Sequence, residues 1–125
     1  MTGEQLPDLV RAFILKYIDS VAELEGLLLV RSTAGAAWDV SQLAARLYIS
    51  EADAHAVLQT LHRRALMTRD ASLYRYAPAD ALRVEVDALA DAYPRFLIPI
   101  TDLIHGKPRA SLRDFADAFK LREEK

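Results

Sequence analysis

The sequence predicts a small, mainly α-helical protein that carries one short β-hairpin. Three features of its 125 residues lead to this prediction. Apolar residues recur at intervals of three and four along most of the chain, which is the spacing of amphipathic helices. Ser20 and Ser50 each precede an acidic residue by three positions, a pattern typical of a helix N-cap. Residues 66–76 instead have the pattern of two short strands joined by a turn.

Two helices are predicted in the N-terminal part of the chain. Pro7 fits the first turn of a helix, because its missing N–H would have no intrahelical partner there. The apolar stripe of this helix is Leu9, Val10, Phe13, Ile14 and Tyr17. Ser20 and Glu23 form a capping box for the second helix, and Gly35 is available as a left-handed cap at its end.

Residues 38–78 combine helical and strand patterns. Trp38 and Val40 are predicted to form a short strand that pairs with the hairpin. A helix follows, with the apolar residues Leu43, Ala44 and Leu47. After a tight turn, a second helix buries Ala54, Val57, Leu58 and Leu61. The runs 66–68 and 73–76 then supply the two strands of the hairpin, and residues 70–72 form its turn.

The order helix, turn, helix and hairpin resembles the winged helix-turn-helix of bacterial transcription regulators of the MarR and PadR kind. The matching residues are Leu43, Ala44, Leu47, Ile49, Ser50, Leu58, Leu61, Leu66 and Met67. Where these regulators often carry glycine, this chain has Tyr48 and Ala65. The resemblance implies a single winged-helix domain over 1–125, with the helix-turn-helix and wing at 38–78 and extra N- and C-terminal helices around them.

One long helix is predicted over residues 79–105. Its apolar residues recur in alternating steps of four and three, which is a heptad seam: Leu82, Val86, Leu89, Tyr93, Phe96, Ile100 and Leu103. Pro94 and Pro99 each remove an intrahelical hydrogen bond, so we expect a kink or break near Tyr93. The seam either pairs two copies of the chain, as in the regulators it resembles, or packs on the helix at 7–18. A final helix is predicted over 111–122.

The resemblance further implies that the helix at about 50–64 enters the major groove of DNA. Glu51, His55 and Gln59 would then contact base edges. Five arginines would hold phosphates: Arg46, Arg63, Arg64, Arg69 and Arg75. We therefore expect a homodimeric transcription regulator that binds double-stranded DNA.

An alternative function is a winged-helix module that binds another protein and no DNA. The chain has a net charge of −2, whereas a dedicated nucleic-acid binder is often basic. Residues 38–78 carry five arginines against four acids, so the motif is only weakly basic. Asp53 would also repel phosphate from the start of the second motif helix. Both functions remain open on the sequence.

No residue pattern predicts an enzyme, a metal site or a cofactor. The chain has no cysteine, its three histidines lack metal-ligand spacing, and its four glycines are scattered singly. No serine lies in a nucleophile-elbow pattern. No apolar run approaches the length of a membrane-spanning helix, and no signal peptide opens the sequence. We therefore expect a cytoplasmic protein that does not enter the membrane.

Overall fold

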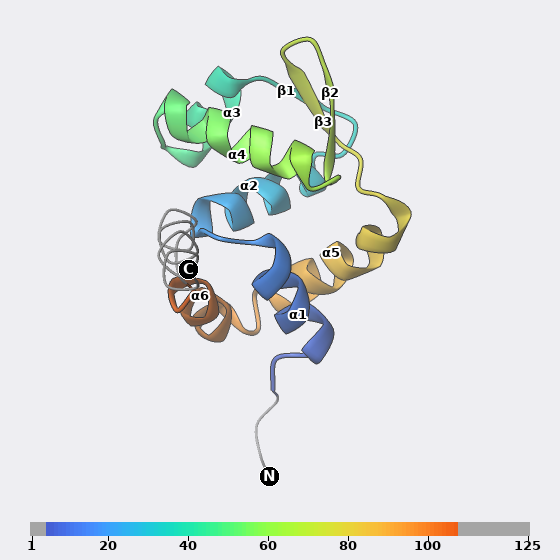
Figure 1. The fold of residues 1–125 in the computed structure, drawn as a ribbon. Helices are drawn as coiled ribbons and strands as arrows, with labels where there is room; N and C mark the ends of the chain where they lie inside the picture. The colour runs from blue at the N-terminus through green and yellow to red at the C-terminus, as the bar shows by residue number, and fades with distance from the viewer. Residues whose placement is uncertain (1–4, 108–125) are drawn as a thin grey trace, which may run out of the picture.

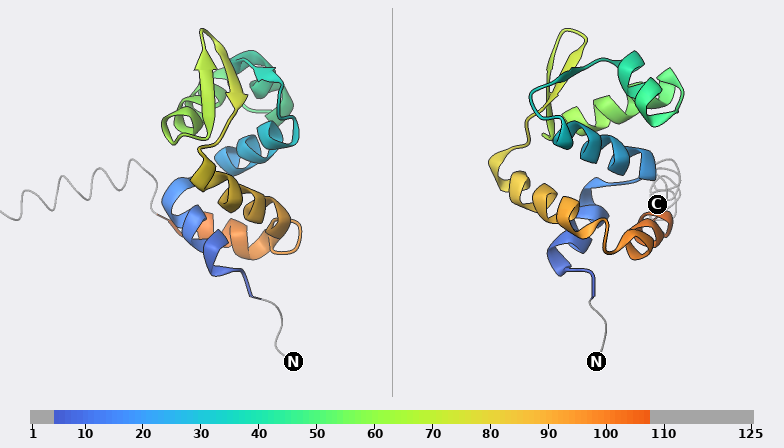
Figure 2. Two further views of the ribbon diagram at one scale, coloured as in Figure 1. Left: turned by 90° about the vertical axis from the view of Figure 1, so that its right-hand side faces the viewer. Right: turned by 180° about the vertical axis from the view of Figure 1, so that it is seen from behind.

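The computed structural model describes residues 5–107. Its elements in chain order are α1 (Asp8–Tyr17), α2 (Val21–Ser32), β1 (Ala37–Trp38), α3 (Val40–Leu47), α4 (Glu51–Arg63), β2 (Met67–Asp70), β3 (Leu73–Tyr76), α5 (Asp80–Ala92) and α6 (Leu97–His105). Helices α3 and α4 and the sheet lie on one side of α2, and α1, α5 and α6 lie on the other (Figures 1 and 2). This fold confirms the predicted class: mainly α-helical with a β-hairpin wing, a winged helix-turn-helix with additional helices.

The helix-turn-helix is formed by α3 and α4, and a side chain caps the N-terminus of each. Asp39 and Gln42 form a reciprocal capping box at the start of α3, with N–O distances of 2.8 and 3.0 Å. Tyr48 takes a left-handed conformation (φ 58°) that ends α3 and turns the chain. The Ser50 hydroxyl then accepts from the backbone N–H of Asp53 at 3.0 Å, as predicted. Val40 belongs to α3, so the predicted strand ends at Trp38.

The wing is an antiparallel sheet with strand order β1–β3–β2. Met67 pairs with Tyr76 and Asp70 with Leu73, so the hairpin turn lies at residues 71–72, inside the predicted turn. The Tyr74 side chain points inward and is only 3% exposed, which places the inner face of β3 in the core. The hairpin is therefore anchored to the motif by an aromatic side chain.

The predicted long helix at 79–105 is broken into α5 and α6. The break at residues 93–96 contains Pro94, whereas Pro99 lies in the first turn of α6, where a proline ring is tolerated. Both helices pack on α1 of the same chain. The seam residues Leu82, Val86, Leu89, Phe96 and Ile100 are buried there, and Tyr93 and Leu103 are partly buried.

This packing corrects the predicted role of the seam. Leu82, Val86, Leu89, Phe96 and Ile100 lie in the chain's own core, so the intrachain alternative describes these five. Tyr93 and Leu103 are only partly buried, and their part in pairing two copies stays a prediction. The physical reason is that a break between α5 and α6 folds the two halves of the seam around α1, where both bury apolar surface. The helix predicted at 111–122 lies outside the described residues.

Helix α4 is held close to α2 by a glycine. A Cβ atom added at Gly26 would lie 2.9 Å from Cγ1 of Val57, closer than packed carbon atoms normally approach. Five residues of α4 are buried: Ala54, Val57, Leu58, Thr60 and Leu61. The contact fixes which face of α4 turns inward, and so which face remains outside.

Ala65, in the turn between α4 and β2, has a left-handed backbone with φ of 63°. That conformation costs a non-glycine residue roughly 1–2 kcal/mol, while glycine adds about 0.4–1 kcal/mol of unfolded-state entropy. We therefore expect Ala65→Gly to raise the free energy of unfolding by about 0.5–1 kcal/mol, as measured by urea denaturation. Ala45→Gly in α3 is the control and should lower it by about 1 kcal/mol. Equal losses in both variants would contradict the strain at Ala65.

Candidate nucleic-acid interface

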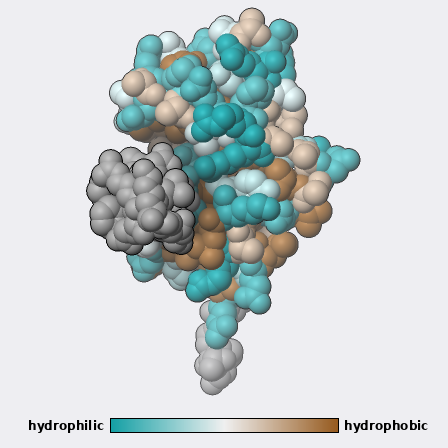
Figure 3. Space-filling model, in the orientation of Figure 1, coloured by the Kyte–Doolittle hydropathy of each residue, from teal (hydrophilic) through white to brown (hydrophobic). Residues whose placement is uncertain are grey.

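Within residues 5–107, the outward face of α4 is exposed. At 100° per residue, the positions opposite the buried side are Ala52, Ala56, Gln59 and Arg63, with His55 beside them. All five are exposed. Within residues 5–107 no hydrogen bond occupies the Gln59 amide or the His55 ring. In the orientation of Figure 1, the upper part of the surface, where α3, α4 and the wing lie, is largely hydrophilic with scattered apolar residues (Figure 3).

The first turn of α4 is acidic and is connected to α3. The Ser41 hydroxyl donates to a carboxylate oxygen of Glu51 at 3.0 Å. Asp53 lies on the same turn, where a negative charge stabilises the helix N-terminus. Glu51 is thus both a predicted base-contacting residue and part of the contact between the two motif helices.

Three predicted phosphate-binding arginines lie exposed on α3 and the wing. Arg46 lies over the Trp38 ring at 5.7 Å, and Arg69 lies over the Tyr74 ring at 5.8 Å. Arg75 donates to the Gly35 carbonyl at 2.7 Å. These contacts limit the freedom of the three side chains while leaving them accessible. Both α3 and the wing, whose strand β2 packs against α4 as α3 does, thus carry exposed positive charge.

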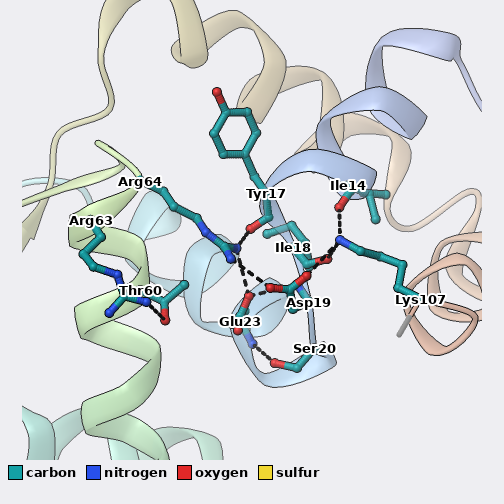
Figure 4. Close-up of polar contacts among 10 residues, drawn as sticks. All are labelled: Ile14, Tyr17, Ile18, Asp19, Ser20, Glu23, Thr60, Arg63, Arg64 and Lys107. Carbon is teal, nitrogen blue, oxygen red and sulfur yellow. Dashed lines mark hydrogen bonds and ion pairs between the residues drawn. The ribbon is translucent and has the colours of Figure 1, made fainter. Parts of the chain in front are cut away.

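Arg63 and Arg64 are neighbours in sequence but have different surroundings. Arg63, the last residue of α4, is exposed and bonds Thr60 at 3.3 Å. The Arg64 side chain turns toward the linker between α1 and α2, where it pairs with Asp19 at 2.8 Å and Glu23 at 3.3 Å (Figure 4). It also donates to the Tyr17 carbonyl.

These ion pairs argue against the predicted role of Arg64 in holding phosphate. Its side chain is only 23% exposed, and its charge is matched by two carboxylates of the same chain. One residue beyond Arg63, the chain has rotated by about a quarter turn, which points Arg64 away from the outward face. The sequence position alone did not distinguish the two arginines.

Lys107 and Asp19, which the sequence did not single out, complete this group of charges. Lys107 follows α6 and lies 3.0 Å from Asp19, and its side chain is 7% exposed. Its ammonium also donates to the carbonyls of Ile14 and Ile18 at the end of α1 (Figure 4). We call Asp19, Glu23, Arg64 and Lys107 the Asp19 network.

The network determines the ionisation of Asp19. Burial opposes loss of its proton, but hydrogen bonds from Arg64 and Lys107 and their two positive charges outweigh burial. Together they lower the pKa of Asp19 from 3.8 to about 2. The carboxylate is thus charged at any physiological pH.

No protein-family model matches this chain, and no curated protein matches it. A solved structure of BpsR from Bordetella bronchiseptica, concerning the regulation of its DNA binding by 6-hydroxynicotinic acid, is similar in overall fold. The two chains are 20% identical, the match covers 93% of this chain and 81% of that chain, and the TM-score is 0.49. At this similarity no residue role is carried from BpsR to this chain.

None of the helices within residues 5–107 has both the length and the apolar character needed to span a membrane. No group of three or more histidine, aspartate or glutamate side chains within residues 5–107 is arranged to hold a metal ion. The outward face of α4 and its flanking arginines are therefore the strongest candidate site in this part of the chain.

The pKa of Asp19 predicts an acid-dependent stability. Because the folded pKa lies below the unfolded value of 3.8, the stabilisation is complete above about pH 5 and is lost as pH falls toward 2. The contribution of Asp19 to the free energy of unfolding that is lost in this way should be about 2 kcal/mol. Urea denaturation at a series of pH values measures the free energy of unfolding of the wild type and of Asp19→Asn. The difference between these two free energies should shrink as the pH falls over this range. A difference that is constant with pH would contradict the charged network.

Proposed function

We propose that this protein is a transcription regulator that binds duplex DNA through α4 and acts as a homodimer. The outward face of α4 is the observation that carries the proposal. It has no partner among the described residues, and the neighbouring elements α3 and the wing carry exposed arginines. A helix presented in this way fits the major groove, and a wing beside it fits the adjacent backbone.

The side chains on this face have the chemistry of base recognition. The Gln59 amide can donate to N7 and accept from the N6 amino group of adenine only with both of its polar atoms free, as they are here. Ala52 and Ala56 are small enough for close approach to the groove floor and can contact thymine methyl groups. Arg63 lies at the end of the face, within reach of a phosphate or a guanine.

Four arginines remain for phosphate contacts once Arg64 is excluded: Arg46, Arg63, Arg69 and Arg75. If each neutralises one phosphate, the logarithm of the binding constant should fall against the logarithm of salt concentration with a slope of about −3.6 per protomer. A protein contacting DNA without these residues would show a shallower slope. The salt dependence therefore tests the arginine set independently of the sequence that is bound.

We expect selection from a random duplex pool to yield a preferred site. On that site, fluorescence anisotropy should show that Gln59→Ala weakens binding by about 1–3 kcal/mol and relaxes the preference at one position. Arg63→Ala should reduce the salt slope by about 0.9. The control is Arg11→Ala, which removes the same charge from an exposed position of α1. It should change neither the affinity for the selected site nor the salt slope.

Absence of any duplex binding at low salt would overturn this proposal and favour the second candidate function. That candidate is a protein-binding module, and the acidic first turn of α4 supports it, because Glu51 and Asp53 would attract a basic partner surface rather than a phosphate. Recovery of one stoichiometric protein partner, lost with Glu51→Gln and Asp53→Asn, would be the positive result for that function.

The homodimer is supported by exposed apolar side chains in the half of the molecule that carries α1, α5 and α6: Leu9, Leu15, Val84, Leu97 and Ile98. Ile98 is 70% exposed and Val84 65% exposed. This half lies on the other side of α2 from α4 (Figure 1). Two copies joined here would leave both α4 helices free, as symmetric recognition of two half-sites requires.

The mass in solution tests the homodimer. Light scattering after size exclusion should give twice the 14.0 kDa of one chain for the wild type. Ile98→Lys should shift the mass toward a single chain, because it places a charge in an apolar contact. Leu73→Ser on the wing is the control, and it should leave the mass unchanged. A monomeric wild type at all concentrations would contradict the homodimer.

A further inference from the structure

The Asp19 network connects three elements that are far apart in sequence. Asp19 lies in the linker between α1 and α2, Arg64 follows α4, and Lys107 follows α6 (Figure 4). The two oxygens of the Asp19 carboxylate take different cations: Oδ2 lies 2.8 Å from Arg64 Nη2, and Oδ1 lies 3.0 Å from Lys107 Nζ. One side chain therefore holds the end of α4 and the end of α6 at once.

The backbone at the end of α1 binds the same two cations. Lys107 donates to the Ile14 carbonyl at 2.9 Å and to Ile18, and Arg64 donates to the carbonyl of Tyr17. These carbonyls form the negative end of the α1 dipole. The network thus combines two carboxylates and a helix C-terminus against two cations.

The network is well shielded from solvent. The exposed fractions of the Lys107, Asp19 and Arg64 side chains are 7%, 11% and 23%. A buried pair strongly resists loss of one partner, because the other charge is then left without compensation. The arrangement therefore tolerates little change in the relative position of the three elements.

Elsewhere α4 has little direct connection to the half containing α1, α5 and α6. It packs on α2, α3 and β2, whereas α1 packs on α5 and α6. Arg31 of α2 and Asp87 of α5 form another ion pair between the two halves at 3.0 Å, but they are 35% and 54% exposed. Apolar contacts permit small sliding movements, whereas a two-sided carboxylate bridge fixes distance and direction.

We propose that Asp19 is a positioning residue, which fixes α4 relative to α1 and α6 by binding Arg64 and Lys107 with its two carboxylate oxygens. This positioning stands on the geometry of the network alone. Its consequence for DNA binding rests on the proposed function above: Asp19 determines the angle at which α4 is presented without itself approaching the DNA.

Spin labels can measure the positioning directly, because the chain has no cysteine. Labels at Ala52→Cys on α4 and Asp102→Cys on α6 occupy exposed positions outside the network. The labelled chain is diluted in an excess of unlabelled chain, so that most homodimers hold at most one labelled copy. We then expect a single narrow distance between the two labels in the otherwise wild-type chain. Asp19→Asn should broaden or split this distance. Asp87→Asn, which removes the same charge from the exposed ion pair, is the matched control and should leave it narrow.

A second variant keeps the test decisive if Asp19→Asn does not fold. Lys107→Gln removes only the connection to α6 and retains the Arg64–Asp19 pair, so it should broaden the distance while circular dichroism shows that the helices remain. A narrow, unshifted distance in every folded variant of the network would overturn the proposal.

The effect on DNA is a separate measurement. On a selected duplex, Asp19→Asn should weaken binding roughly two- to thirtyfold while the salt slope stays the same. If the wild type binds no duplex, the proposed function fails while the label distances still decide the role of Asp19. If the distance broadens and DNA affinity is unchanged, Asp19 positions α4 but the angle of α4 does not matter for binding.

Discussion

The division of α4 into a buried and an exposed face is the constraint on which the rest of the structure depends. Val57, Leu58 and Leu61 each gain about 1.5–3 kcal/mol by burial. An exposed ion pair contributes at most about 1 kcal/mol, so burial determines the rotation of α4 about its axis. Gly26 permits the close approach to α2 that completes this burial. The outward residues are then exposed because the opposite side is occupied.

The connection of α4 to the other half of the molecule has a different physical basis. Apolar packing sets which faces meet, but it is non-directional and leaves the angle between packed helices only loosely defined. The Asp19 network adds direction, since each carboxylate oxygen accepts from a donor on a different element. Arg64 is used in this way and is unavailable for phosphate, while its neighbour Arg63 remains at the surface. Arg64 therefore takes part in the Asp19 network, whereas Arg63 remains accessible at the surface.

Local patterns in the sequence predicted much of the motif. The N-caps at Ser20 and Ser50, the order of α3 and α4 and the hairpin turn were all predictable, because capping and periodicity involve residues three or four apart. The unusual residues at Tyr48 and Ala65 also marked the two turns, where both have left-handed backbones. The hydrogen-bonded box at Asp39 was missed, because that stretch also suited a strand.

The sequence by itself determined most of the helices and strands and which side of each is apolar, because these properties arise from neighbours along the chain. Only the tertiary structure decided what each apolar side packs against. The heptad seam at 82–103 is equally suited to a second copy or to α1, and the break at Pro94 directs it onto α1. The orientation of the Arg64 side chain was likewise decided by its ion pair with Asp19, 45 residues away, because an ion pair depends on proximity in space rather than in sequence.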